Sequence, residues 1–336
     1  MSTIGVVVNP TAGRGRGRRD GARTLALLRE AGHTVVDLSG PNLPLALETA
    51  HAGVHHDTRL APGTADGLDA LVVVGGDGMV HLGVNAVAGT TTPLGIVAVG
   101  SGNDTAAALG LPVRDVRAAV TTALDALTAP RTIDAATVRT HHPSGTAADT
   151  PAGTAPDTAP RWFCGVLSAG IDAAVNARAN RQRWPRGSAR YVRAVVAELA
   201  RFVPYGYRLT LTGADGHPHV WESPGSLVAV ANGPRIGGGV RIAPDARLDD
   251  GLLDVVVAGP LTRLGAARIF PGMYAGRHVH HRSVHVHQVT HVVLEATTAG
   301  HAPPPAFADG EHIGNLPLEV HVHPGALRVL APGGEP

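Results

Sequence analysis

Two short glycine-rich segments in the N-terminal part of the chain have residue types suited to phosphate chemistry. The first, GGDG at residues 75–78, follows an apolar run and precedes a stretch with helical spacing. The second, GSGND at residues 100–104, repeats the order of strand, glycine turn and helix. Backbone N–H groups at such a turn carry the positive end of the helix dipole, and the missing side chains let a phosphate approach. The alternative is a tight turn that needs glycine only for its backbone conformation.

A third glycine-rich turn, NPTAGRGRG at residues 9–17, follows the apolar run at residues 3–8. Ligands of parallel sheets bind in the crevice at the carboxyl ends of the strands. Three such turns after three strands therefore favour a nucleotide site over three unrelated tight turns. None of the turns matches the GxGxxG fingerprint, and the chain has no G-K-[ST] phosphate loop.

Two aspartates lie within these turns and would repel a phosphate unless a cation lay between them. Asp77 belongs to the first turn, and Asp104 follows Asn103 in the second. Mg²⁺ is the usual mediator between carboxylates and phosphates. For Asp104 the alternative role is that of a helix N-cap.

The elements around these turns divide the chain in two. Up to about residue 130, strands alternate with helices, which predicts a parallel sheet covered on both faces. Beyond that point, strand-like runs separated by Gly, Pro and Asp predict a β-sandwich or a similar antiparallel domain, with one helical stretch at 187–202. We therefore expect a nucleotide-binding α/β domain at residues 1–131 and a β-rich domain at residues 132–336. Residues 141–160 are poor in large apolar side chains, so we expect a disordered insertion there.

Composition narrows the class of protein. The 336 residues are enough for two domains with separate cores, and 28 basic against 27 acidic residues argue against a nucleic-acid binder. No apolar stretch approaches the roughly 18 residues of a membrane span. The N-terminus has no basic region or cleavage site, so we expect no secretory signal. The single cysteine, Cys164, is expected to be a buried and inert thiol in a reducing compartment.

These motifs resemble those of the diacylglycerol kinase catalytic domain, the lipid kinase family that also includes sphingosine and ceramide kinases. The three glycine turns match its nucleotide motifs, and VANGPRIGGGVRIAPDARLDDGLLDVVV and FADGEHIG match motifs of its second domain, in order along nearly the whole chain. The GGDG turn alone is shared with NAD kinases and phosphofructokinases, so the D-G-L-L-D-V and D-G-E segments favour a lipid kinase. The resemblance implies a Rossmann-like ATP domain, a β-sandwich lipid domain and an active site in the cleft between them.

The resemblance also implies roles for individual residues. Glu311 would be the general base for the lipid hydroxyl, and Asp77, Asp104 and Asp134 would organise the catalytic Mg²⁺. A second, structural Mg²⁺ would be held by Asp250 and the carbonyls of Arg247 and Leu252. The implied ATP contacts are Asn9, Ser39, Gly75, Gly76, Asp77, Gly78, Met79, Gly100, Ser101, Gly102 and Asn103. On the residues alone, the segment around Glu311 is equally well explained as a hairpin connection.

The sequence departs from the family pattern at two of these positions. Met79 replaces a threonine, and Ser101 replaces another but keeps a hydroxyl. The methionine removes one hydrogen bond to the phosphates, worth about 1 kcal/mol. We expect this change to affect catalytic efficiency more than nucleotide binding.

Other polar clusters allow more than one interpretation. Arg14, Arg16, Arg18 and Arg19 either contact phosphates or form a solvated basic loop. A second basic cluster surrounds Trp184 and either rests on anionic headgroups or is an exposed helix end; its arginines are Arg178, Arg181, Arg183, Arg186, Arg190 and Arg193. His285 and His287 share a strand face, as do His321 and His323, but neither pair has an evident carboxylate partner, so a solvent-facing polar edge is favoured over a metal site.

Three functions remain open at this point. The first is an ATP- and Mg²⁺-dependent kinase of diacylglycerol or a related long-chain alcohol, with a place in lipid metabolism and phospholipid biosynthesis. The second is a kinase of the same superfold that acts on a soluble substrate such as NAD, and the third is a non-catalytic nucleotide- or lipid-binding relative. For the first, we expect a cytoplasmic protein without a transmembrane segment that meets its lipid by peripheral contact at the inner face of the membrane. We expect no nucleic-acid partner, and a homodimer stays open.

Overall fold

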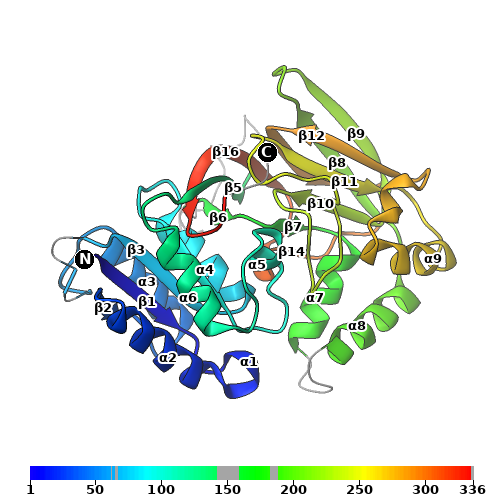
Figure 1. Cartoon of the computed structure of the whole chain (residues 1–336). Coiled ribbons are helices and arrows are strands. Elements are labelled where there is room, and N and C mark those ends of the chain that lie inside the picture. Colours follow the sequence, from blue (N-terminus) through cyan, green and yellow to red (C-terminus); the bar gives the residue numbers. More distant parts are fainter. Residues whose placement is uncertain (62, 65–66, 142–158, 182–187, 334–336) are drawn as a thin grey trace, which may run out of the picture. The chain divides into compact units, whose positions relative to one another are not determined.

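The computed structural model describes all residues except 62, 65–66, 142–158, 182–187 and 334–336 (Figure 1). The chain forms two compact units, one of Met1–Ala135 with the residues from Pro324 onward, the other of Ala136–His323. The sequence placed the whole C-terminus in the second domain, and the structure corrects this. The end of β16 (Leu318–Val329) belongs to the first unit because Val329 pairs in parallel with Leu94 of β4. The expected insertion at 141–160 falls, apart from its ends, outside the described residues.

The first unit is built on a parallel sheet with the strand order β2-β1-β3-β4. Its strands are β1 (Thr3–Val8), β2 (Thr34–Asp37), β3 (Ala70–Gly75) and β4 (Leu94–Ala98). Val8 pairs with Val74, and Gly75 pairs with Ala98. This register brings the carboxyl ends of β1, β3 and β4 to one edge, as the sequence predicted. The glycine turns all leave the sheet at that edge.

Helices cover both faces of this sheet, which confirms the predicted Rossmann-like α/β fold (Figure 1). The helices are α1 (Ala12–Gly15), α2 (Gly17–Glu30), α3 (Leu43–Val54), α4 (Asp77–Val87), α5 (Asp104–Ala108) and α6 (Val116–Asp125). Val72 and Val74 share a core with residues of α2 and α6. Val73, which points to the other face, lies against Gly83 of α4. Successive side chains of a strand alternate between faces, so α2 and α6 lie opposite α4.

The second unit is a sandwich of two β-sheets, again as predicted. One sheet contains β5 (Arg131–Thr140), β6 (Arg161–Phe163), β8 (Tyr205–Thr212), β9 (Pro218–Gly225), β13 (His291–Ala296) and β16. The other contains β7 (Val166–Ser168), β10 (Leu227–Ala231), β11 (Leu253–Ala258), β12 (Val284–Val289), β14 (Ala306–Ala308) and β15 (Glu311–Gly314). Leu209 and Val292 from the first sheet share one buried cluster with Val230 and Val255 from the second. Burial of these apolar faces holds the sheets together.

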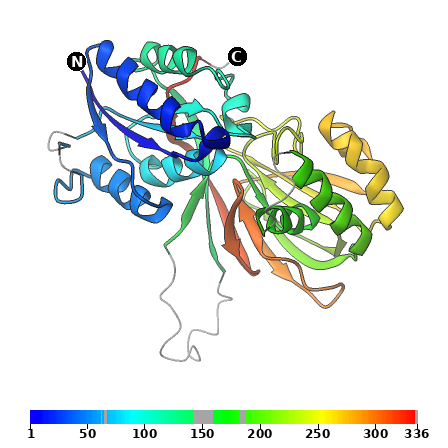
Figure 2. The same ribbon diagram turned by 90° about the horizontal axis from the view of Figure 1, so that it is seen from below.

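Helices accompany the sandwich, and the sequence predicted one of them. The expected stretch at 187–202 is α8 (Ser188–Arg201), but α7 (Ile171–Arg181), α9 (Arg263–Tyr274) and the short 3₁₀ helix η1 (Arg277–His280) were missed. Figure 2 shows the two green helices α7 and α8 side by side with the gold α9 beyond them. The apolar run before Ile171 resembles a continuing strand. Helix α9 contains Pro271 and no buried residue, so it lacks the apolar stripe that identifies a helix.

Candidate active site

The two glycine turns at the carboxyl edge of the first unit pack directly against each other. A Cβ atom on Gly100 would lie 2.4 Å from the Cα of Gly76, and one on Gly102 would lie 2.5 Å from Asp77 Oδ2. Neither position has room for a side chain, and both glycines have ordinary negative or extended backbone angles. The reason for glycine here is close approach of two backbones rather than a left-handed turn. The result is a surface of bare main chain at the N-terminus of α4, whose N-cap is Gly76.

Asn103 closes the second turn with its own side chain. Its Oδ1 accepts a hydrogen bond from Gly100 N at 2.9 Å, and its Nδ2 donates to Gly100 O at 3.0 Å. The residue is buried and adopts a left-handed conformation with φ +66°, which asparagine tolerates well. Asn103, not Asp104, is the N-cap of α5, so the N-cap alternative for Asp104 is wrong. The side-chain amide of Asn103 therefore holds the shape of the loop.

Asp77 joins the two turns. Its Oδ2 accepts from Asn103 N and its Oδ1 from Asp104 N, both at 2.8 Å. Burial, and then the negative charge of Asp104, raise the pKa of Asp77, while these backbone N–H groups lower it. The two carboxylates repel each other because both are negatively charged. Their oxygens, next to exposed main chain, are suitable ligands for a divalent cation.

The other predicted nucleotide contacts at this edge also order the backbone. Asn9 Oδ1 accepts from the backbone N–H and the hydroxyl of Thr11, at 3.0 and 2.8 Å. Ser39 Oγ accepts from Val8 N at 2.9 Å at the end of β1. Met79 is buried, and its side chain lies close to Gly75. A Cβ atom on Gly75 would lie only 2.3 Å from the Cγ of Met79. Met79 thus packs under the first turn.

A basic cavity of about 180 Å³ lies beside the second turn in the same unit. It is lined by Val99 and Val116, by the carboxylates Asp20 and Asp115, and by the arginines Arg16, Arg19, Arg23 and Arg114. Arg114 Nη2 lies 3.5 Å from Ser101 O. Of the four arginines named in the first basic run, Arg16 and Arg19 line the cavity. This placement favours the phosphate-contact interpretation for those two.

Asp134 is the third acidic residue predicted to organise the catalytic Mg²⁺, and it lies in the first unit. It is buried on β5, and its Oδ1 accepts a hydrogen bond from Gly325 N at 2.8 Å. Its carboxylate thereby ties β5 to β16, the two strands through which the chain passes between the units.

Glu311 lies in the second unit, at the start of β15, directly after a tight turn. Asp309 and Gly310, both with positive φ, form the two-residue loop between β14 and β15, as in a type I′ hairpin. The hairpin interpretation is therefore correct for the backbone. The carboxylate of Asp309 accepts from the N–H groups of Cys164, Gly165 and Val166 at 2.9 to 3.1 Å, which fixes the hairpin to β7.

The surroundings of Glu311 are partly buried and charged. Burial lowers the pKa of Arg161, and the negative charge of Glu311 acts in the opposite direction, so the two side chains are within electrostatic reach. Asn176 of α7 donates from Nδ2 to Gly310 O at 3.2 Å. A carboxylate directly after a loop that is fixed at both of its residues is suited to act as a positioned base. The sequence did not single out Asp309 or Asn176, whose roles depend on contacts far along the chain.

The predicted structural magnesium loop contains a cluster of carboxylates. Asp250 Oδ1 accepts from Leu252 N at 3.0 Å, and Arg247 pairs with Asp249 at 3.5 Å. Burial, followed by the charges of Asp250 and Asp245, raises the pKa of Asp254 to about 6, although a hydrogen bond from Gln288 lowers it. Carboxylates that repel one another in this way are stabilised by a divalent cation.

Asp172 is a candidate that sequence analysis missed. Both of its carboxylate oxygens are buried without a hydrogen-bond partner among the described residues, as is the Oγ of Ser168. Burial raises the pKa of Asp172 to about 6, and nearby hydroxyl and backbone N–H groups offset this only in part. A buried acceptor without a donor is costly and is characteristic of binding sites. The acidic residue inside the apolar segment VLSAGIDAA was the available signal.

These units match two families of known proteins. Residues 3–138 match the diacylglycerol kinase catalytic domain, and residues 165–331 match the YegS C-terminal NAD kinase beta sandwich-like domain. Together with the full-length relatives described next, these matches show that the chain belongs to the diacylglycerol kinase family of lipid kinases.

Relatives extend over nearly the whole chain. A diacylglycerol kinase of Mycobacterium tuberculosis is 34% identical over 99% of this chain and 96% of its own length. A protein of Chromohalobacter salexigens named "Probable lipid kinase YegS-like" is 30% identical over 91% of this chain and 87% of its own. The crystal structure of a diacylglycerol kinase from Bacillus anthracis, 16% identical, covers 98% of this chain and 96% of that one with a TM-score of 0.64, which supports the fold.

Within the described residues, no helix combines the length and apolar character needed to cross a bilayer.

Proposed function

We propose that this protein transfers the γ-phosphate of ATP, in a Mg²⁺-dependent reaction, to the hydroxyl of diacylglycerol or a related long-chain lipid alcohol. The observation that carries the proposal is the surface of bare main chain made by the Gly76 and Gly100 turns at the N-terminus of α4. Phosphoryl transfer depends mainly on positioning and charge neutralisation, and such a surface provides both. Family membership supports the lipid as the acceptor.

The residues of the first unit have complementary roles in this reaction. The turns that contain Asn9, Gly76 and Gly100 would hold the nucleotide, with Asn103 keeping the second turn in shape. Asp77 and Asp104 would hold the catalytic Mg²⁺, either directly or through water. When bound, that ion neutralises charge on the transferred phosphoryl group. Arg16 and Arg114 lie in the adjacent cavity and would add positive charge near the phosphates.

Residues of the second unit would act on the acceptor. The Glu311 carboxylate would orient the lipid hydroxyl and take its proton at a carboxylate oxygen, because a free alcohol is a poor nucleophile. Asp309 positions Glu311 through its bonds to β7. Asp172, whose two buried oxygens make no hydrogen bond of good geometry among the described residues, would accept one from a polar group of the lipid.

Contact with the lipid would take place at a membrane surface, on the cytoplasmic side. The basic cluster proposed for this contact lies partly outside the described residues, since Arg183, Trp184 and Arg186 fall in the gap at 182–187. Within the described part, Arg178 is paired with Glu198 of α8, while Arg181 is exposed. Arg181 is therefore the better candidate for headgroup contact.

A direct experiment measures phosphate transfer by the purified protein to a panel of lipid alcohols in micelles. We expect transfer from ATP that disappears when EDTA removes Mg²⁺ and returns when Mg²⁺ is restored. Nucleotide binding without transfer to any lipid would contradict the proposal and support a non-catalytic relative.

A second prediction concerns the carboxylate loop of the second unit. If Asp250 holds a structural Mg²⁺, added Mg²⁺ should raise the melting temperature of the wild-type protein, and Asp250→Ala should abolish that rise. Asp249→Ala is the matched control, because Asp249 is the adjacent exposed residue and pairs with Arg247 instead. Thermal melts with and without Mg²⁺ measure this effect. An equal rise in melting temperature for wild type and Asp250→Ala would show that Asp250 does not bind the ion.

A further inference from the structure

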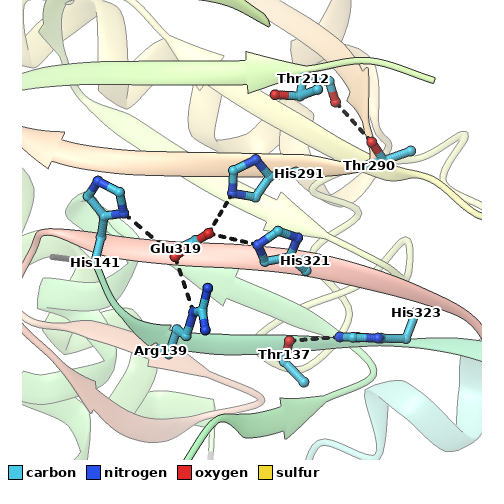
Figure 3. Close-up of polar contacts among 9 residues, drawn as sticks. All are labelled: Thr137, Arg139, His141, Thr212, Thr290, His291, Glu319, His321 and His323. Atoms are coloured by element: carbon cyan, nitrogen blue, oxygen red, sulfur yellow. Dashed lines mark hydrogen bonds and ion pairs between the residues drawn. The ribbon is translucent and has the colours of Figure 1, made fainter. Parts of the chain in front are cut away.

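A cluster of two histidines and a glutamate lies on one face of β13 and β16 in the second unit (Figure 3). His291 of β13 is the direct cross-strand partner of His321 of β16. Glu319 precedes His321 by two residues, so the two side chains point to the same face. No carboxylate partner of His321 was evident from the sequence, and the structure corrects this: Glu319 and His291 both lie beside it.

The three side chains point at a common centre. His291 Nε2 lies 3.1 Å and His321 Nε2 lies 2.8 Å from the same oxygen, Glu319 Oε1. The two rings stack with centroids 3.9 Å apart and an interplanar angle of 19°. One nitrogen of each histidine and one oxygen of the glutamate all lie within 4.8 Å of one another. Ligand atoms about 2.0–2.1 Å from a tetrahedral zinc ion are about 3.3 Å apart, so only small shifts would admit an ion.

The second oxygen of Glu319 has its own partners. Arg139 Nε lies 3.1 Å and His141 Nδ1 lies 3.6 Å from Oε2, as Figure 3 shows. Arg139 therefore fixes the carboxylate while Oε1 faces the histidines, the arrangement expected of a supporting group around a metal ligand. His323, further along the same face, is engaged with Thr137 Oγ1 at 2.9 Å and lies against Trp162, so it stands apart from the set.

The three candidate ligands are accessible from solvent. The side chains are 14 to 40% exposed, so an ion can reach them from solvent.

We propose that His291 Nε2, His321 Nε2 and Glu319 Oε1 bind a divalent transition-metal ion of the zinc type, with water in the fourth position. Imidazole nitrogens select such ions over Mg²⁺, which prefers oxygen ligands, so this site is distinct from the magnesium sites proposed above. The ion would join β13 to β16 at a paired position. The site is independent of the proposed kinase activity, and its test measures binding only.

The test is a titration of the purified, EDTA-treated protein with Zn²⁺ in competition with a chromophoric chelator, and with Co²⁺ followed by its visible absorption. We expect one ion per chain, a Co²⁺ spectrum typical of tetrahedral nitrogen and oxygen ligands, and no displacement by a hundredfold excess of Mg²⁺. His321→Gln and Glu319→Gln should each weaken Zn²⁺ binding by more than about tenfold.

The matched control is His219→Gln. His219 also belongs to a histidine pair, with its ring 5.4 Å from that of His287, but no carboxylate completes that pair among the described residues. This variant should bind Zn²⁺ like wild type. His321 is the most exposed of the three ligands, so its replacement is the least disruptive to folding, and circular dichroism checks each variant. Equal Zn²⁺ affinity in wild type and His321→Gln, or an equal loss in His219→Gln, would overturn the proposal. A wild-type Co²⁺ spectrum that is unchanged from free octahedral Co²⁺ would do the same, whatever the variants do.

Discussion

Glu311→Gln should lower kcat for lipid phosphorylation by about 10²–10⁴ while ATP affinity stays near the wild-type value. Glutamine keeps the shape of the side chain and one acceptor but cannot take the proton of the lipid hydroxyl. The hairpin should remain intact, because it depends on Asp309 rather than on Glu311. Steady-state kinetics with separately measured ATP binding test this, since KM need not equal a dissociation constant.

Two further variants make the result specific. Glu295→Gln changes a partly buried glutamate on β13 in the same unit and should leave kcat unchanged. Asp77→Asn should alter ATP affinity as well as the rate, because Asp77 accepts hydrogen bonds from the backbone of both Asn103 and Asp104. If Glu311→Gln keeps most of its kcat on every lipid that the wild type phosphorylates, Glu311 is not the base and the D-G-E segment is only a turn.

Asp172→Asn should stabilise the protein at neutral pH and impair its use of the lipid. A carboxyl group whose pKa rises from 3.8 to about 6 on folding costs the folded state about 3 kcal/mol at pH 7. The sign follows from proton uptake. Below pH 4 the group is protonated in both states and costs nothing. Between about pH 4 and 6 the unfolded chain loses the proton first, so the stability of the wild type falls as the pH rises.

Urea denaturation of wild type and variant at several pH values measures this difference. The variant should gain little at pH 4 and up to about 3 kcal/mol at pH 7, together with a raised KM for the lipid. Asp125→Asn is the control, since Asp125 is exposed on α6 and its replacement should change neither quantity. A variant that is less stable than wild type at pH 7 would mean that the Asp172 carboxylate has a stabilising partner in the folded protein.

The fold of the first unit could largely be predicted from the sequence, because each buried strand is followed by a glycine turn and then by a helix. This pattern of strand, glycine turn and helix does not predict the second unit. There, α7 begins at Ile171, only three residues after β7 ends at Ser168. The final segment of β16 could not be assigned to the first unit, since its pairing with Leu94 joins residues more than 200 positions apart. Such pairings depend on tertiary packing rather than on local propensity.

In the candidate site, too, residue types could be predicted from the sequence, whereas contacts between distant segments could not. The sequence identified Asp77 and Gly100 by residue type and position. It did not predict the contact between Gly76 and Gly100 or the two hydrogen bonds of Asn103 to its own loop, because these depend on how the loops fold. The spacing of Glu319 and His321 on one strand is visible in the sequence. Their meeting with His291 depends on the register of β13 with β16.

Transfer of labelled γ-phosphate is the most direct test of the central claim. The purified protein is incubated with γ-labelled Mg·ATP and either diacylglycerol in mixed micelles or NAD in buffer, and the label is followed in the organic and aqueous phases. We predict label in an organic-extractable phospholipid, none in NAD, and a rate reduced by about 10²–10⁴ in Glu311→Gln. Label transferred to NAD but not to any lipid alcohol would contradict the account.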